Sequence, residues 1–150
     1  MRFKSRQVGG YRVYAVTGTN TVSFGIDFAA ANTDGLLGFA VERVDPAANR
    51  RRFLNGFKVF PSVVRQPGEQ TTVSTQDHPV QSFVWDDFTA RDGHAYEYLF
   101  HPLRGSPDDI DRSAKPIRIS SSWTARSTNE RTPKRRRFAA GSTRSKVDAE

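Results

Sequence analysis

A strict two-residue alternation near the N-terminus is the feature that most constrains the fold of this chain. Over residues 22–28, large apolar side chains alternate with Ser, Gly and Asp; the apolar positions are Val22, Phe24, Ile26 and Phe28. Successive side chains of a β-strand point to opposite faces, so the pattern predicts a strand with one face on a core and the other in water. Such a strand needs antiparallel neighbours and a second layer that covers its apolar face.

Further alternating segments supply these neighbours. Turn residues such as Gly, Pro, Asn and Asp separate the segments, and none of the segments is a convincing amphipathic helix. The expected strands cover residues 11–16, 37–42, 53–60, 80–87, 96–101 and 115–120, with a short edge strand at 71–73 inside an otherwise polar loop over 62–79. The chain is therefore predicted to be an all-β protein with an antiparallel β-sandwich fold.

Two of these segments lie in an aromatic-rich stretch over residues 80–104, which contains Trp85 and Tyr98. The residues between them, Ala-Arg-Asp-Gly-His at 90–94, have the composition of a tight polar turn. We expect the two strands to pair as a hairpin.

Residues 53–60 carry a mixed signal. Their three Phe residues also fit helical spacing, whereas Gly56 within the segment and Pro61 after it disfavour a helix. The expected structure is a strand with a bulge or kink at 55–56.

Domain boundaries follow from composition. Residues 1–10 are expected to be a flexible lead, residues 11–122 the β-sandwich, and residues 123–150 a disordered basic tail, because the apolar alternation stops there. The net charge of the chain is +7, and the tail has 8 Lys and Arg residues against 3 Asp and Glu residues. Most of the net positive charge therefore lies outside the expected sandwich.

The absence of Cys excludes disulfides and thiolate metal sites, and it fits a reducing compartment. No apolar run is long enough to span a membrane, and the N-terminus lacks the apolar segment of a signal peptide. A cytoplasmic protein is expected.

The His and Asp residues do not form a recognisable catalytic or metal-binding motif. The three histidines are 16 and 7 positions apart, unlike the close ligand pairs of zinc sites, and are expected to be surface or turn residues. They are His78, His94 and His101.

Asp86 and Asp87 are adjacent in an expected strand, so they should point to opposite faces and shield an edge or pair with an Arg. The acidic residues at 108–111 lack the Gly and Glu of an EF-hand loop. No catalytic, cofactor-binding or metal-binding residue is predicted.

The basic tail offers a different kind of site. Four consecutive cations could bind the phosphate groups of nucleic acid or an anionic membrane surface in a nonspecific, salt-sensitive manner. They are Lys134, Arg135, Arg136 and Arg137. The alternative is a solvated terminus without a partner, which the absence of interleaved aromatic residues favours.

Residues 92–100, Asp-Gly-His-Ala-Tyr-Glu-Tyr-Leu-Phe, resemble the end of the fibronectin type III pattern, in which Pro-Gly-x-x-Tyr leads into an alternating strand. The resemblance implies a fibronectin type III or immunoglobulin-like sandwich. It also implies that Tyr96 is the corner tyrosine, whose hydroxyl bonds back to the preceding turn. Asp92 stands in place of the usual Pro.

A longer resemblance covers residues 8–120. Gly-Leu-Leu-Gly-Phe-Ala-Val-Glu-Arg at 35–43, Leu-Asn-Gly-Phe-Lys-Val-Phe at 54–60 and the segment 78–90 are similar to the N-terminal region of bacterial phospholipase D-like proteins. In that family a sandwich precedes a catalytic part with two His-x-Lys-x4-Asp motifs. None of the three histidines here has Lys two positions later, so no catalytic residue is carried over.

The resemblance implies a non-catalytic accessory or interaction domain that ends before the enzyme, with a phospholipase D-like catalytic domain as the expected partner. The patternless tail fits a truncated or frameshifted end, a hypothesis that the downstream DNA sequence would test. Nonspecific nucleic-acid binding by the tail is the alternative function.

Overall fold

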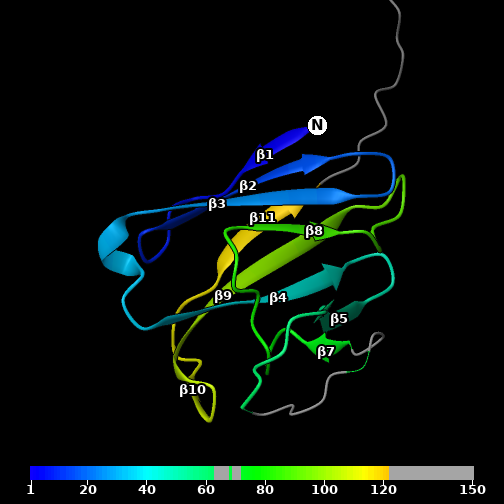
Figure 1. Ribbon diagram of the computed structural model, residues 1–150. Helices are drawn as coiled ribbons and strands as arrows, with labels where there is room; N and C mark the ends of the chain where they lie inside the picture. The colour runs from blue at the N-terminus through cyan, green and yellow to red at the C-terminus, as the bar shows by residue number, and fades with distance from the viewer. Residues whose placement is uncertain (63–67, 69–71, 122–150) are drawn as a thin grey trace, which may run out of the picture.

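The computed structural model describes residues 1–62, 68 and 72–121, and it shows an all-β protein in which two main antiparallel sheets face each other (Figure 1). The predicted all-β class and antiparallel β-sandwich are confirmed. The described residues contain no α-helix; a single 3-10 turn, η1 (Ala30–Asn32), follows β3.

The first sheet has the strand order β1-β2-β3-β8, with every neighbouring pair antiparallel. Its strands are β1 (Arg2–Lys4), β2 (Tyr11–Thr17), β3 (Val22–Phe28) and β8 (Val84–Asp87). Alternation along β2 and β3 buries one face of each strand, as the sequence predicts. The expectation of a flexible lead over residues 1–10 is wrong at β1, because Arg2 pairs with Val16 and Lys4 with Tyr14.

The second sheet has the order β10-β9-β4-β5, and β11 also pairs with β9. Its strands are β4 (Leu36–Asp45), β5 (Arg50–Phe53), β9 (Tyr96–Ser106), β10 (Asp109–Asp111) and β11 (Ile117–Ser121). Strand β4 ends directly before Pro46, which has no amide hydrogen for a ladder. A small third pair joins β6 (Asn55–Gly56) to β7 (Val73–Ser74).

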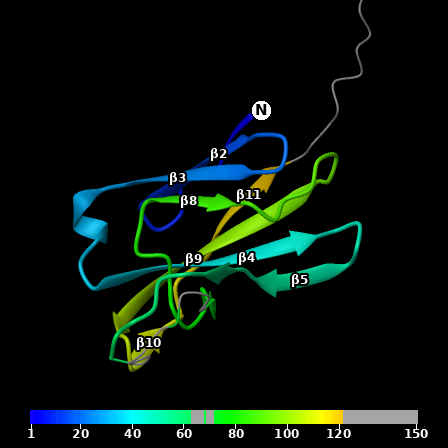
Figure 2. The same ribbon diagram turned by 45° about the vertical axis from the view of Figure 1, so that its right-hand side comes forward.

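The predicted hairpin between the strands of the 80–104 stretch is wrong. Strand β8 pairs with β3 in the first sheet, whereas β9 pairs with β4 in the second, and residues 88–95 connect the two layers (Figure 2). The two strands contribute to the core from different sheets. Trp85 is the cross-strand neighbour of Phe24 in the first sheet, with ring centroids 6.0 Å apart, while Tyr98 meets the same Phe24 from the opposite sheet at 4.7 Å.

The expected strand over 53–60 is also shorter in the structure. Strand β5 ends at Phe53, and residues 55–56 form β6, which pairs with β7 and not with β4. The bulge or kink expected at 55–56 is therefore a change of partner strand. Of the edge strand expected at 71–73, Val73 belongs to β7, and Thr71 lies outside the described residues.

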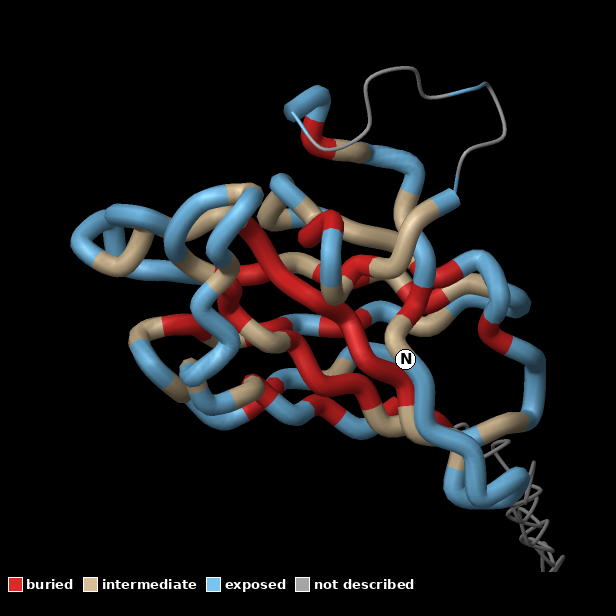
Figure 3. The backbone as a smooth tube through the Cα atoms, turned by 90° about the horizontal axis from the view of Figure 1, so that it is seen from below, coloured by how far each residue is buried: buried red, intermediate tan, exposed pale blue. Residues whose placement is uncertain are grey.

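The core lies between the two sheets and is rich in aromatic side chains. Buried backbone follows the middle of the facing strands (Figure 3). Phe24 occupies its centre, because its ring contacts Trp85, Tyr98 and Phe100, the last at 5.0 Å. Clustered aromatic rings of this kind contribute both buried apolar area and favourable edge-to-face contacts.

A buried polar network joins the two sheets beside this core. Arg43 of β4 donates to the Asp87 carboxylate of β8 at 2.7 Å, and both side chains are nearly inaccessible. The same carboxylate accepts hydrogen bonds from Tyr98 at 2.9 Å and from the amide and hydroxyl of Thr89 at 2.8 and 2.7 Å. Burial, together with the neighbouring Asp87 charge, raises the pKa of Tyr98, so its hydroxyl stays protonated and able to donate. The expectation that Asp87 pairs with an Arg is confirmed.

The network also bears on the corner tyrosine. Tyr96 is buried at the start of β9, where its ring stacks with His94 and lies 4.6 Å from the Arg43 guanidinium. Within the described part of the chain no hydrogen bond involves the Tyr96 hydroxyl, and the bond back to the preceding strand is made by Tyr98. The expected hydrogen bond from Tyr96 to the preceding turn is thus not among those that the structure shows, and Tyr98, two positions along the same strand face, bonds to Asp87.

Replacing Tyr98 with Phe is expected to lower the free energy of unfolding by about 1.5–3 kcal/mol, the range for a hydrogen bond to a charged group. Tyr96→Phe is the matched control and should change it by less than about 0.5 kcal/mol, because no hydrogen bond is removed. Urea unfolding midpoints measure both. A larger loss for Tyr96→Phe than for Tyr98→Phe would restore Tyr96 as the corner residue.

Candidate functional site

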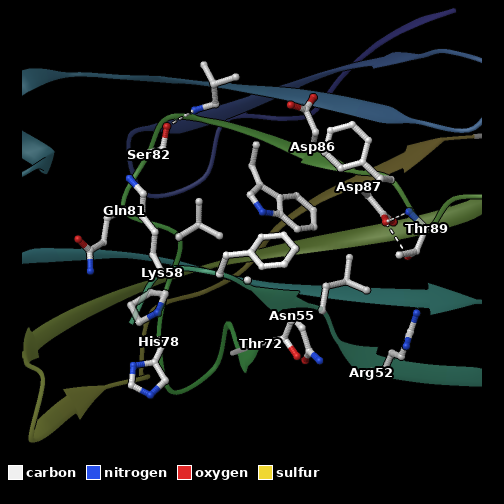
Figure 4. Close-up of a pocket in the computed structure, with 18 residues that line it drawn as sticks. Arg52, Asn55, Lys58, Thr72, His78, Gln81, Ser82, Asp86, Asp87 and Thr89 are labelled. Atoms are coloured by element: carbon white, nitrogen blue, oxygen red, sulfur yellow. Dashed lines mark hydrogen bonds between the residues drawn. The ribbon is translucent and has the colours of Figure 1, made fainter. Parts of the chain in front are cut away.

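An open cleft of about 600 Å³ lies between β8 and the β5–β6 segment (Figure 4). In Figure 4, Ser82, Asp86, Asp87 and Thr89 lie along one wall, and Arg52 and Asn55 lie along the other. The volume falls within the range of about 300–1,000 Å³ that is usual for ligand sites. The full lining comprises residues 52, 54–58, 72, 78–82 and 84–89.

The cleft exists because both sheets end there. Strand β8 is the last strand of the first sheet, and β5 is the last strand of the second. The space between the sheets therefore continues outward past these two edges, and no further strand of the described residues pairs with either edge. Trp85 forms part of one wall and Leu54 part of the other, so the cleft continues the apolar core.

Three large apolar side chains at the cleft are exposed to solvent. Phe57 is 78% exposed, Phe88 72% and Val84 64%. Single exposed apolar residues are common on protein surfaces, but several that line one cleft mark an interaction site. These three residues, with the partly buried Trp85, are called the apolar rim below.

The charges around the apolar rim are unevenly distributed. Arg52 and Lys58 line the β5–β6 wall, and neither has a carboxylate partner among the residues that the structure describes. Asp86 lies on the β8 wall, while Asp87 is already committed to Arg43. The cleft therefore offers two available cations on one side and one available carboxylate on the other.

The histidines do not come together. His78 is a turn residue, as one of the two expected alternatives has it, because its amide donates to the Ser74 carbonyl at 2.9 Å; it is buried and not on the surface, and its Nδ1 accepts a hydrogen bond from the Phe60 amide at 3.2 Å. His101 contacts the buried Glu42 at 3.0 Å on the second sheet. Hydrogen bonds from Arg51 and His101 hold the pKa of Glu42 below its ordinary value, despite burial. In the described ranges no group of three or more His, Asp or Glu residues could hold a metal ion.

Other residues singled out in the sequence are not at the cleft. The acidic residues at 108–111 belong to the turn and strand around β10, where Asp111 accepts a hydrogen bond from the Ser113 amide at 2.8 Å. Lys134, Arg135, Arg136 and Arg137 lie outside the described residues.

Comparison of the chain with protein-family models, with curated proteins and with solved structures finds no match. None of the helices in the described part of the chain is long and apolar enough to cross a membrane.

Sequence reasoning missed the apolar rim. An apolar residue in an alternating segment is normally assigned to the core, and Phe57 and Val84 stand in such segments. A partial signal existed at Phe88, which follows two Asp residues where the alternation ends. Its exposure becomes evident only when β8 is placed at the edge of its sheet.

Proposed function

We propose that the chain is a non-catalytic binding module whose ligand site is the cleft between β8 and the β5–β6 segment. The observation that carries the proposal is the exposed apolar rim, since solvent exposure of Phe57, Val84 and Phe88 around one cleft is unfavourable unless a ligand covers them. Binding of a ligand there requires no reactive group, and the sequence contains no His-x-Lys-x4-Asp motif.

Within this proposal the module serves as an accessory domain of a phospholipase D-like phosphodiesterase. This role rests on the resemblance of segments 35–43, 54–60 and 78–90 to the N-terminal region of such proteins. The strand arrangement supports a fibronectin type III or immunoglobulin-like module, because consecutive strands β8 and β9 lie in opposite sheets and β11 returns beside β9.

The binding proposal is tested with the apolar anionic dye anilinonaphthalenesulfonate, which fluoresces on exposed apolar surface. The folded chain should give a saturable signal, and Phe57→Ser and Phe88→Ser should each weaken it about threefold or more, because each removes apolar contact area. Val16→Ser is the matched control, since Val16 is 47% exposed but lies on β2, away from the cleft. Equal loss in all three variants would contradict a site at the cleft.

The non-catalytic part of the proposal has its own readout. The isolated chain should hydrolyse bis(4-nitrophenyl) phosphate no faster than buffer does. Turnover above buffer that persists through purification, and that changes when a residue of this chain is replaced, would refute it.

A further inference from the structure

Strand β8 has one paired side and one open side. It is the last strand of the first sheet, and among the residues that the structure describes it forms a ladder with β3 alone. On its other side lies the cleft. The backbone groups on that side are therefore available to a further strand.

The register identifies these groups. The Ile26 amide donates to the Phe83 carbonyl at 2.8 Å, so these two residues form a hydrogen-bonded pair. Hydrogen-bonded and non-hydrogen-bonded pairs alternate along an antiparallel ladder. The backbone groups of Trp85 and Asp87 therefore bond to β3, and those of Val84 and Asp86 point to the open side.

Three of the four open groups have no partner in the part of the chain that the structure describes. The Val84 amide donates to the Ser82 hydroxyl at 3.1 Å. The Val84 carbonyl and both backbone groups of Asp86 are unpaired among the described residues. This set of one donor and two acceptors matches what an added strand presents.

A strand added to β8 would lie over the end of the second sheet, in the space that the cleft occupies. Its inward side chains would meet Leu54 and Phe57 on the opposite wall. Because side chains alternate along a strand, every second residue of the ligand would face inward. Arg52 and Lys58 are on that wall, so an inward carboxylate would be stabilised there.

The charges also argue against a second copy of this chain as the occupant. Pairing of two β8 edges would bring the two Asp86 side chains onto the same small ladder, and like charges across a ladder are destabilising. A charged side chain on an edge strand commonly prevents self-association in this way. A different polypeptide, with acidic and apolar residues facing inward, fits the cleft better.

We propose that the open edge of β8 binds an extended peptide segment of a partner protein by strand addition, with alternate apolar and acidic side chains in the cleft. This inference rests on the proposed binding function and names the ligand class. Main-chain hydrogen bonds to Val84 and Asp86 supply the strand register, while Leu54, Phe57 and the two cations on the opposite wall select the inward side chains.

The experiment uses the full chain and the probe peptide acetyl-Val-Thr-Glu-Lys-Leu-Thr-Val-amide, in which Val, Glu, Leu and Val share one face. Binding is followed by NMR of the nitrogen-15-labelled protein and by amide hydrogen exchange. The Asp86 amide should become protected on binding, by about tenfold or more. The Trp85 and Asp87 amides, already bonded to β3, serve as internal controls and should change much less.

Two peptides and two protein variants complete the design. Two N-methylated forms of the probe are compared, each methylated on one of the two alternating sets of amides. A methylated amide cannot donate to a ladder, so methylation of the set that faces β8 should abolish binding. Asp86→Pro removes the open donor at a position not bonded to β3, so it should weaken binding about tenfold or more. Phe57→Ser should do the same, and Val16→Ser should not.

The outcomes separate the two proposals. Peptide binding without protection of the Asp86 amide, and insensitive to N-methylation, would overturn strand addition and leave the binding module standing. No peptide binding at millimolar concentration, with the dye still bound at the cleft, would also overturn strand addition alone. A concentration-dependent dimer that Asp86→Pro abolishes would assign the edge to a second copy and overturn the peptide partner.

Discussion

Replacing Asp87 with Ala is expected to lower the free energy of unfolding by about 3–5 kcal/mol. The Asp87 carboxylate lies between the sheets and accepts four hydrogen bonds, from the Arg43 side chain, the Tyr98 hydroxyl, and the amide and hydroxyl of Thr89. Removing it leaves the Arg43 guanidinium buried without a counter-charge. The cost of an unpaired buried charge exceeds the value of any one of the hydrogen bonds.

The double variant Arg43→Met with Asp87→Leu is the control for this prediction. Replacing a buried ion pair by apolar side chains of similar volume is often close to neutral, so the double variant should recover most of the loss. Unfolding in urea, followed by tryptophan fluorescence, measures both variants. If Asp87→Ala costs less than about 1 kcal/mol, water reaches Arg43 in the native state and the network is not buried in solution.

The sequence pattern was sufficient to predict the positions of strands that bury one face and expose the other. Alternation placed β2, β3, β4 and β11 close to their observed positions, because each carries large apolar residues at every second position and turn residues at its ends. Strand β1 was missed because three residues with one Phe contain too short an alternation to distinguish a strand from a loop. Whether residues 2–4 form a strand depends on their pairing with β2, which the local sequence does not show.

The assignment of strands to sheets could not be predicted in the same way. Strands β8 and β9 both carry aromatic residues on one face, and a short polar connection between such strands favours a hairpin locally. The structure separates them because Trp85 is the cross-strand neighbour of Phe24 within the first sheet, whereas Tyr98 packs on Phe24 from the second sheet. No local pattern contains this tertiary arrangement. The position of the cleft depends on this separation, because β8 is an edge strand only when it pairs with β3 and not with β9.

The choice between Tyr96 and Tyr98 shows a different limit. Both tyrosines lie on one face of β9, so spacing alone assigns them equivalent environments. The hydrogen bond goes to Tyr98 because Asp87 approaches that position from the other sheet. Which of the two tyrosines bonds to Asp87 could therefore not be predicted from the strand pattern.

Replacing Gly38 with Ala is expected to lower the free energy of unfolding by about 2–4 kcal/mol and to weaken ligand binding at the cleft. Gly38 has φ of +143°, and a Cβ atom there would lie 2.3 Å from the Val80 carbonyl oxygen and 2.9 Å from its carbon. These are backbone atoms, so they cannot rotate away. The segment that must move is held to β4 by the hydrogen bonds between Phe39 and Val80, at 3.0 and 2.9 Å.

The cleft should respond because Pro79 and Val80 line it, and the bridge to Phe39 fixes the segment that leads into β8. Gly35→Ala is the matched control: Gly35 also has a positive φ, of +67°, but nothing lies within 4 Å of its added Cβ. It should cost only about 1 kcal/mol, from backbone strain, and leave dye binding at the cleft unchanged. Urea unfolding and dye titration distinguish the two variants. Equal losses in stability would mean that positive φ, and not the close approach of Val80, is the reason for glycine at position 38.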